Sequence, residues 1–243
     1  MKKLLKSFLN FWYRPLVMFY LKWERKYYYE SLRLVVLPGV FHPGYFHSTL
    51  FMCETLASIS LKNKNVLELG AGTGMLSIYC VKKGALATAS DISWKAIINI
   101  DKNARWNRVA ITILQSDLFK NIPKQKFDLI LINPPYYKKN PKTDAERAWY
   151  CGENMEYFAN LFEQIPFFIT KDSTVLMVLS QDCDIHGIKR MAEANNLDFT
   201  LRTEKQFRFE KNFIFTIGLN KSVDNYAAGS NSVGSEKSER AIT

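Results

Sequence analysis

The tetrapeptide Asn133-Pro134-Pro135-Tyr136 is the part of this sequence best suited to chemistry. It follows an apolar run, residues 127–132, whose length and flanking prolines predict a buried strand. Two consecutive prolines fix φ twice and remove two hydrogen-bond donors, so the chain should leave the sheet in a stiff turn. Such a turn holds an amide side chain, exposed carbonyl groups and an aromatic ring at fixed distances. These groups can grip a planar –NH₂ group by its edges and its face.

A glycine-rich motif, residues 66–74, runs from another predicted strand into a predicted helix that opens at Met75. Glycine lets the backbone turn tightly and approach a ligand, and a helix N-terminus offers free N–H groups to a carboxylate or phosphate. The candidate ligand-binding glycines are Gly70, Gly72 and Gly74. Glu68 can anchor this loop or a ligand's ammonium group. Because Met75 stands where a dinucleotide-binding loop continues toward a further glycine, the spacing argues against NAD. A turn without a ligand is the alternative interpretation.

Two acidic residues stand at the ends of later predicted strands. Asp91 is placed where a carboxylate can accept hydrogen bonds from both ribose hydroxyls, and Ile92 follows it in the candidate cofactor-binding set. An N-cap of the next helix is the alternative for Asp91, and the two roles are compatible. Asp117 could accept from an adenine amino group while Leu118 flanks the ring. For Asp117 the alternative is an ordinary turn residue.

The elements that must position these residues alternate along the chain. Strand-like apolar runs occupy residues 65–69, 86–91, 111–115, 127–132, 174–179, 197–202 and 212–218, and helical patterns occupy 74–83, 95–106, 154–169 and 184–195. This alternation predicts an α/β fold, with a mainly parallel seven-stranded sheet covered by helices on both faces. No helix fits between the last two runs, so they should form an antiparallel hairpin at one edge.

Three segments differ in composition, and we divide the chain accordingly. Residues 1–47 form a basic amphipathic arm, residues 48–220 the main domain and residues 221–243 a disordered tail rich in Ser, Asn and Gly. In the arm, apolar and aromatic residues recur every three or four positions as far as Tyr27, which predicts a helix. Its alternatives are contact with an anionic membrane through residues 1–30, contact with RNA, or packing on its own domain.

The loop and helix between the arm and the glycine-rich region are also predicted. Residues 34–47 contain two Pro-Gly pairs and read as a loop. Ser48 then has the character of an N-cap for a helix that runs through about Ser60.

The composition of the 243 residues limits the cofactors, compartment and partners. The formal net charge of +10 favours an acidic partner such as RNA, a ribonucleoprotein or an anionic membrane, against a merely solvated basic surface. The four cysteines are far apart and the three histidines make no metal-ligand spacing with them, so we expect no metal. No secretory signal and no apolar stretch long enough to span a membrane is evident, which predicts a cytoplasmic protein.

The four chemical signals together resemble class I S-adenosylmethionine-dependent methyltransferases over residues 48 to about 219. The Asn-Pro-Pro-Tyr motif and residues 148–158 are most similar to the HemK-type protein glutamine-N5 and small-domain N-methyltransferases. The resemblance implies a Rossmann-like methyltransferase fold and S-adenosyl-L-methionine as cofactor. It assigns catalysis to Asn133, Pro134 and Tyr136. It assigns cofactor binding to Glu68, Gly70, Gly72, Gly74, Asp91, Ile92, Asp117, Leu118 and Asn133.

The implied reaction is direct methyl transfer to a planar amide or amino nitrogen. The favoured substrate is a glutamine side chain of a translation factor or ribosomal protein. One alternative is adenine-N6 or guanine-N2 methylation of rRNA or tRNA, and a second is a non-catalytic S-adenosylmethionine-binding module tethered to RNA or membrane. The sequence leaves the oligomeric state and the role of the arm open.

Overall fold

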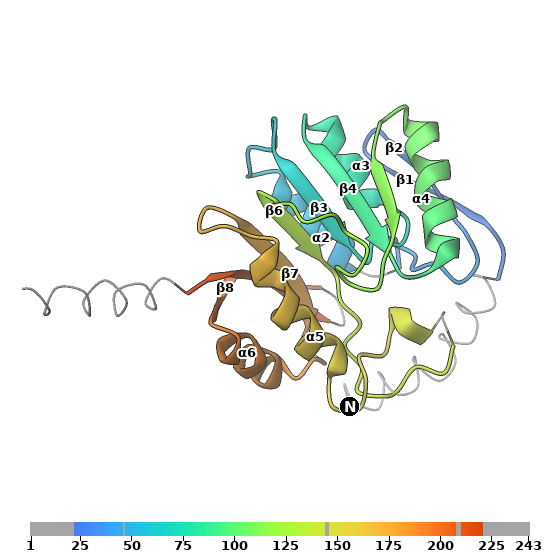
Figure 1. Ribbon diagram of the computed structural model, residues 1–243. Coiled ribbons are helices and arrows are strands. Elements are labelled where there is room, and N and C mark those ends of the chain that lie inside the picture. The colour runs from blue at the N-terminus through green and yellow to red at the C-terminus, as the bar shows by residue number, and fades with distance from the viewer. Residues whose placement is uncertain (1–21, 46, 144–145, 208–209, 221–243) are drawn as a thin grey trace, which may run out of the picture.

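A seven-stranded sheet forms the centre of the computed structural model (Figure 1), which describes residues 22–45, 47–143, 146–207 and 210–220. The strands are β3 (Asn65–Leu69), β4 (Leu86–Asp91), β5 (Thr112–Gln115), β6 (Leu129–Ile132), β7 (Thr174–Ser180), β8 (Leu197–Gln206) and β9 (Lys211–Leu219). Their order across the sheet is β5-β4-β3-β6-β7-β9-β8. The first five are parallel neighbours, and β9 pairs antiparallel with both β7 and β8. The predicted parallel sheet with an antiparallel edge hairpin is confirmed.

Helices cover both faces of this sheet (Figure 1), as predicted. α2 (His47–Leu56), α3 (Met75–Lys82) and α4 (Trp94–Asn107) lie over one face, and α5 (Glu156–Gln164) and α6 (Ile185–Ala194) over the other. Adjacent residues of β3 show the alternation: Val66 packs with α2 and α3, whereas Leu67 packs with α5 and α6. The short central strand β6 is buried along its whole length, which explains its unbroken apolar sequence.

Several element boundaries differ from the sequence predictions. α2 begins at His47, so Ser48 lies inside the helix rather than capping it, and the helix ends at Leu56. The predicted helix 154–169 is shorter, because Pro166 lies in a 3-10 turn, η2 (Ile165–Phe167), after α5. A second 3-10 turn, η1 (Glu146–Ala148), follows the Asn-Pro-Pro-Tyr segment.

The helix predicted for the arm is wrong at its C-terminal end. Residues there form an antiparallel hairpin, β1 (Arg25–Tyr29) and β2 (Leu32–Val36), which also replaces the first part of the predicted loop 34–47. Tyrosines and β-branched residues favour strands, and burial in β1 alternates along the chain, so the helical period of earlier residues does not extend here. The remainder of the predicted helix and the predicted tail lie outside the described residues.

The hairpin is fixed to the main domain by a ladder of asparagines on α4. The ladder residues are Asn99, Asn103 and Asn107. Their spacing of four places them on one side of the helix, where their side-chain oxygens accept the backbone N–H groups of Arg33, Val35 and Leu37 at 2.7–3.0 Å. The side chains thus take the place of a third strand along the free edge of β2. This holds the following segment, residues 37–45, over the C-terminal ends of the parallel strands.

The start of the main domain at residue 48 stays a prediction. Leu32 and Leu34 of the hairpin lie before this boundary, yet they pack in the same apolar cluster as α2 and α3. Across the described residues, no helix is both long and apolar enough to cross a membrane.

Candidate active site

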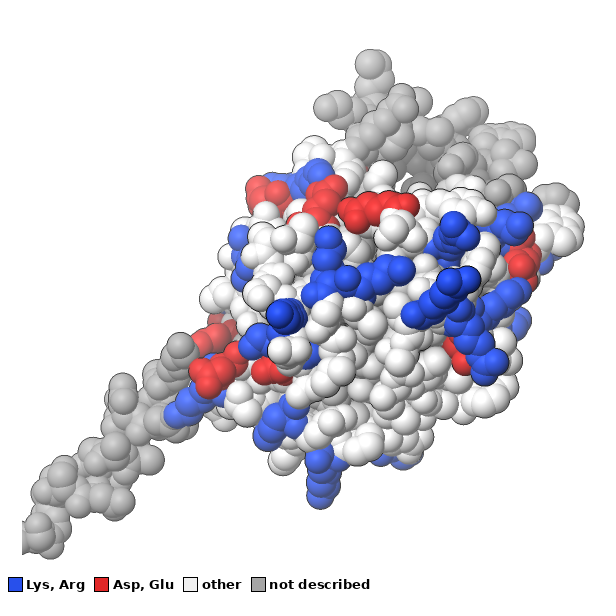
Figure 2. All heavy atoms as spheres, turned by 90° about the horizontal axis from the view of Figure 1, so that it is seen from above, with Lys and Arg blue, Asp and Glu red and all other residues white. Residues whose placement is uncertain are grey.

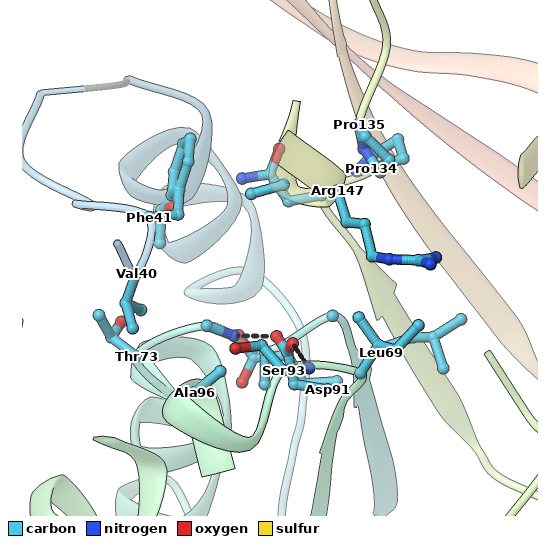
Figure 3. Close-up of a pocket in the computed structure, with 18 of the residues that line it drawn as sticks. Val40, Phe41, Leu69, Thr73, Asp91, Ser93, Ala96, Pro134, Pro135 and Arg147 are labelled. Atoms are coloured by element: carbon cyan, nitrogen blue, oxygen red, sulfur yellow. Dashed lines mark hydrogen bonds between the residues drawn. The ribbon is translucent and has the colours of Figure 1, made fainter. Parts of the chain in front are cut away.

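A cavity of about 180 Å³ opens where β3, β4 and β6 end. Its walls are the glycine-rich loop, the turns after β4, β5 and β6, the segment 39–43 and η1. Figure 3 shows Val40 and Phe41 on one side of the cavity and Pro134, Pro135 and Arg147 on the other, with Asp91 beneath them. Parallel α/β sheets bind ligands at this end of their strands. All but one of the residues predicted to form the site line this cavity.

The exception is Gly74, which is not among the residues lining the cavity. It precedes α3 with a φ of 73°, a conformation that favours glycine. A Cβ atom built there would lie 3.0 Å from Cγ2 of Ile100 on α4. The structure therefore gives Gly74 a packing role between α3 and α4.

The other two glycines of the loop do face the cavity. Gly70 and Gly72 have φ values of 73° and 54°, so both positions favour glycine. A Cβ atom on Gly70 would meet no other atom within 4 Å, because that side of the residue is open space. The Gly70 and Ala71 N–H groups donate to the Ser90 carbonyl oxygen at 2.9 Å, which ties the loop to β4.

Glu68 braces the helix that follows the loop. Its Oε2 accepts hydrogen bonds from the Ser77 N–H at 2.7 Å and the Ser77 hydroxyl at 2.6 Å. Burial raises the pKa of Glu68 from 4.5 to about 7, although the Ser77 hydrogen bonds oppose this rise. The carboxyl group holds α3 in position and also lines the cavity.

Asp91 joins the glycine-rich loop to the start of α4. Its two carboxylate oxygens accept the N–H groups of Gly72 and Ser93, each at 2.9 Å, as the dashed lines in Figure 3 show. Burial raises its pKa, and these backbone hydrogen bonds oppose the rise. The N-cap of α4 is Ser93 rather than Asp91. A carboxylate has about four acceptor sites, so Asp91 keeps capacity for ligand hydroxyls.

The turn after β5 brings Asp117 and Leu118 to the cavity, next to Ile92 and the Tyr157 ring. Leu118 has a φ of 49°, an uncommon conformation for a branched residue. The Ser116 hydroxyl stabilises this turn by donating to the Leu118 carbonyl oxygen at 2.7 Å. Burial raises the pKa of Tyr157, which keeps its hydroxyl protonated.

The Asn-Pro-Pro-Tyr segment supplies the remaining wall. Asn133 donates through Nδ2 to the Ser48 hydroxyl of α2 at 3.1 Å. Burial raises the pKa of the Tyr136 hydroxyl, and the Ser180 side chain at the end of β7 opposes this rise. Asn133 is therefore held by a serine from another element, and Asn133, Pro134 and Tyr136 all line the cavity.

Sequence reasoning missed part of the wall. Val40 and Phe41 follow the hairpin, Ser48 belongs to α2, and Arg147 and Trp149 come from η1 and the residue after it. The Phe41 and Trp149 rings, which both line the cavity, pack together with centroids 5.6 Å apart. The sequence signal that could have found Phe41 was its aromatic side chain between two Pro-Gly pairs just before a core helix.

The cavity has groups suited to a charged nucleoside ligand. The open space beside Gly70 admits a ligand against the backbone, Asp91 suits a ribose diol, and Asp117 with Leu118 suits an adenine ring. Asn133 lines the same cavity. In the described part of the chain, no group of three or more His, Cys, Asp or Glu side chains could hold a metal ion.

Comparison with known proteins gives the family. A sequence model of the methyltransferase small domain matches residues 31–150. A Methanocaldococcus jannaschii protein, provisionally named protein N5-glutamine methyltransferase, is 42% identical over 157 residues, which cover 62% of this chain and 77% of that protein. The chain belongs to the small-domain methyltransferases. This methyltransferase uses S-adenosyl-L-methionine, and the residues described above fit that cofactor. The predicted family, enzyme class and cofactor are confirmed.

Two further comparisons extend the likeness. The methyltransferase is 27% identical over 170 residues to the ribosomal RNA small subunit methyltransferase C of Hamiltonella defensa, covering 65% of this chain and 50% of that protein. Its fold is similar to that of the E. cuniculi complex responsible for methylation of the eRF1 translation termination factor. That match has a TM-score of 0.59 and 15% identity, and covers 75% of this chain and 99% of the other. The Rossmann-like fold is confirmed.

Proposed function

We propose that this methyltransferase transfers a methyl group to the side-chain amide nitrogen of a glutamine in a protein of the translation apparatus. The observation that carries the proposal is the orientation of Asn133. Because Nδ2 of Asn133 donates to Ser48, its Oδ1 is the atom left to accept a hydrogen bond from a substrate –NH₂ group. The name of the M. jannaschii relative supports glutamine as the substrate.

The bound cofactor supplies an electrophilic methyl group on a sulfonium sulfur. An amide nitrogen is a poor nucleophile because its lone pair is delocalised, so the site must orient it precisely. Asn133 Oδ1 and the Pro134 carbonyl oxygen would accept hydrogen bonds from its two N–H groups, and one of these protons would be released to solvent once the N–C bond has replaced the S–C bond. Both hydrogen bonds strengthen as positive charge develops on the nitrogen, which lowers the barrier rather than only binding the substrate. Tyr136, which lines the same cavity, packs against the flat amide group.

The remaining predicted roles concern the cofactor. In this proposal Gly70 and Gly72 let the cofactor approach the loop, Asp91 accepts its ribose hydroxyls, and Asp117 with Leu118 and Ile92 holds its adenine. Their positions along one cavity support these roles. A cytoplasmic location follows from a substrate in the translation apparatus.

RNA is the second candidate substrate. The net charge of +10 and the rRNA methyltransferase relative favour it. An exocyclic –NH₂ group of adenine or guanine is planar and electron-poor like an amide, so the same oxygens of Asn133 and Pro134 would accept its hydrogens, and Tyr136 would stack on the base.

One experiment separates these substrates. The purified protein is incubated with ribosome-containing lysate and S-adenosylmethionine carrying a labelled methyl group, and the products are then treated with protease or ribonuclease. We expect protease treatment to release the label from the macromolecular fraction. Peptide mass spectrometry should then place the methyl group on a glutamine. Label that is released only by ribonuclease would transfer the proposal to RNA. The Asn133→Ala protein is the control for contaminating activity.

The alternative of a non-catalytic binding module is set aside, because the chain belongs to a family of methyltransferases. Contact of residues 1–30 with an anionic membrane stays a prediction. Sedimentation of the full chain and of a chain that begins at residue 31 with vesicles containing phosphatidylserine measures that contact.

A further inference from the structure

The edge of the sheet opposite the cavity is strongly basic. The five residues that precede each of the five parallel strands include, in total, eight Lys or Arg residues and two Asp residues. The basic residues are Arg108 before β5, Lys82 and Lys83 before β4, Lys62 and Lys64 before β3, Lys124 and Lys126 before β6, and Lys171 before β7, and all are exposed. Figure 2 views the molecule from the side on which these segments lie in Figure 1, and there blue side chains predominate over red ones. We refer to these eight residues as the basic row.

The order of the strands in the sheet places the basic residues, which are far apart in sequence, along one line. Strands β5, β4, β3, β6 and β7 are successive neighbours, and adjacent strands lie about 4.8 Å apart, so the row is roughly 20 Å long. Direct contacts join its parts. The Asn63 N–H donates to the Gly84 carbonyl at 2.8 Å, the Asn65 N–H to Asp128 at 2.8 Å, and Lys126 Nζ to the Ile169 carbonyl at 3.0 Å. The row is therefore a continuous surface.

The fold gives most of these charges little compensation. Asp128 is 3.7 Å from Lys64. Within the described part of the chain, no ion pair is formed by Lys62, Lys82, Lys83, Arg108, Lys124 or Lys126. Two large apolar side chains also protrude along this edge: Leu86 is 67% exposed and Phe167, in η2, is 70% exposed. Phe167 lies beside Lys126, whose ammonium group contacts the Pro166 carbonyl at 3.2 Å. An exposed aromatic ring beside a line of cations is the arrangement that binds a single-stranded nucleic acid.

We infer that the basic row binds RNA, with phosphates along the lysines and an unpaired base stacked on Phe167. A linear polyanion matches a line of cations better than a flat membrane does, and Phe167 has a partner in a base. The row and the cavity lie at opposite ends of the same strands, so RNA bound here leaves the cavity open to its substrate. This inference concerns docking and does not depend on which nitrogen is methylated.

The test compares two triple variants of the full chain that lose the same charge. The first combines Lys62→Ala, Lys83→Ala and Lys124→Ala in the row. The second combines Lys102→Ala, Lys189→Ala and Lys205→Ala, which are ion-paired to glutamates elsewhere on the molecule. Binding of a fluorescent single-stranded RNA is measured by anisotropy over a range of salt concentrations. Calorimetry with S-adenosylmethionine checks that each protein is folded.

Each phosphate contact contributes about 0.7 to the slope of log affinity against log salt for single strands. The first triple variant should therefore lower the magnitude of this slope by about 2 and weaken binding at least about tenfold near 0.1 M salt. The second should leave the slope close to that of the unmodified protein. Equal effects of the two triples, or no RNA binding by the unmodified protein, would overturn the inference.

Phe167→Ala tests the stacking part separately. It should weaken RNA binding about tenfold with an unchanged salt slope, because stacking is not an ionic contact. Leu201→Ala, at an exposed position on β8, is the control. Vesicles containing phosphatidylserine serve as the competing partner. The proposal would be contradicted if the protein bound vesicles more tightly than RNA and if that binding depended on the basic row. It would also be contradicted if the Phe167→Ala and Leu201→Ala proteins bound RNA with equal affinity.

Discussion

The Ser48 hydroxyl accepts a hydrogen bond from Nδ2 of Asn133 at 3.1 Å, although the two residues are 85 positions apart. An asparagine amide has a donor end and an acceptor end, and this bond fixes which end faces the cavity. Ser48 therefore acts as a positioning residue for Asn133.

Replacing Ser48 with alanine should lower kcat and leave cofactor affinity unchanged. One neutral hydrogen bond contributes about 0.5–1.5 kcal/mol, so a decrease of roughly threefold to tenfold is expected. Ser48→Thr keeps the hydroxyl and should retain activity, whereas Ser58→Ala, at an exposed position after α2, is the control. Steady-state kinetics and calorimetry separate kcat from binding. An equal decrease for Ser48→Thr and Ser48→Ala would mean that shape, not the hydroxyl, matters.

Asn133→Ala removes the acceptor proposed to stabilise the reacting nitrogen. Loss of one such oriented polar group lowers kcat by about 10²-fold or more in other enzymes. S-adenosylmethionine should still bind, because the loop and Asp91 are unchanged. A turnover assay paired with calorimetry measures both quantities, with Asn160→Ala on the exposed side of α5 as the control. Unchanged turnover would remove Asn133 from the catalytic site.

Asp91→Ala should weaken cofactor binding. The carboxylate is proposed to accept ribose hydroxyls, and hydrogen bonds to charged groups contribute about 1.5–3 kcal/mol each, so the Kd should rise at least about tenfold. In the unmodified protein, an analogue that lacks the 2′-hydroxyl should bind less tightly than S-adenosylmethionine. In the Asp91→Ala protein, the analogue should bind as tightly as S-adenosylmethionine. Calorimetry with both ligands completes the cycle. Equal loss of analogue affinity in both proteins would place the ribose elsewhere.

Glu68 should make stability depend on pH. Its pKa is raised from 4.5 to about 7 in the folded protein, so the folded state binds this proton more tightly than the unfolded state. The resulting stabilisation is complete below pH 4.5 and is lost as the pH rises through about 7. Glu68→Gln stays neutral and should lack this dependence. Urea unfolding of both proteins between pH 5 and pH 8 measures the difference, and parallel profiles would contradict the prediction.

Asn103→Leu should destabilise the fold strongly. The buried Asn103 side chain accepts from the Val35 N–H at 2.7 Å and donates to the Val35 and Thr73 carbonyl oxygens at 2.9 Å. Leucine would leave these buried groups without partners, and each such group costs about 1–3 kcal/mol. Urea unfolding should therefore show a loss of at least about 2 kcal/mol. Asp101→Asn, on the exposed side of α4, should change stability little; a similar loss there would argue against the ladder.

The sequence alone predicted most of the sheet, because buried parallel strands carry unbroken apolar runs and their connections carry helical periods. Most of the residues that it predicted for the site also line the cavity. Gly70, Asp117 and Asn133 follow such strands and Asp91 ends one, and parallel strands bring their C-terminal ends to one edge. The chemistry of the site is thus encoded locally, in residue types placed just after strands.

Only the tertiary structure decided what holds these residues in place. The hydrogen bond from Asn133 to Ser48, the support of β2 by the α4 asparagines, and the contact of Phe41 with Trp149 all join distant segments. It also gave Gly74 a packing role, because its neighbour Ile100 lies on another helix. Local propensity and periodicity predict which face of a segment is buried in the core. They do not predict which side chains of other segments that face contacts. That choice depends on how helices pack on the sheet.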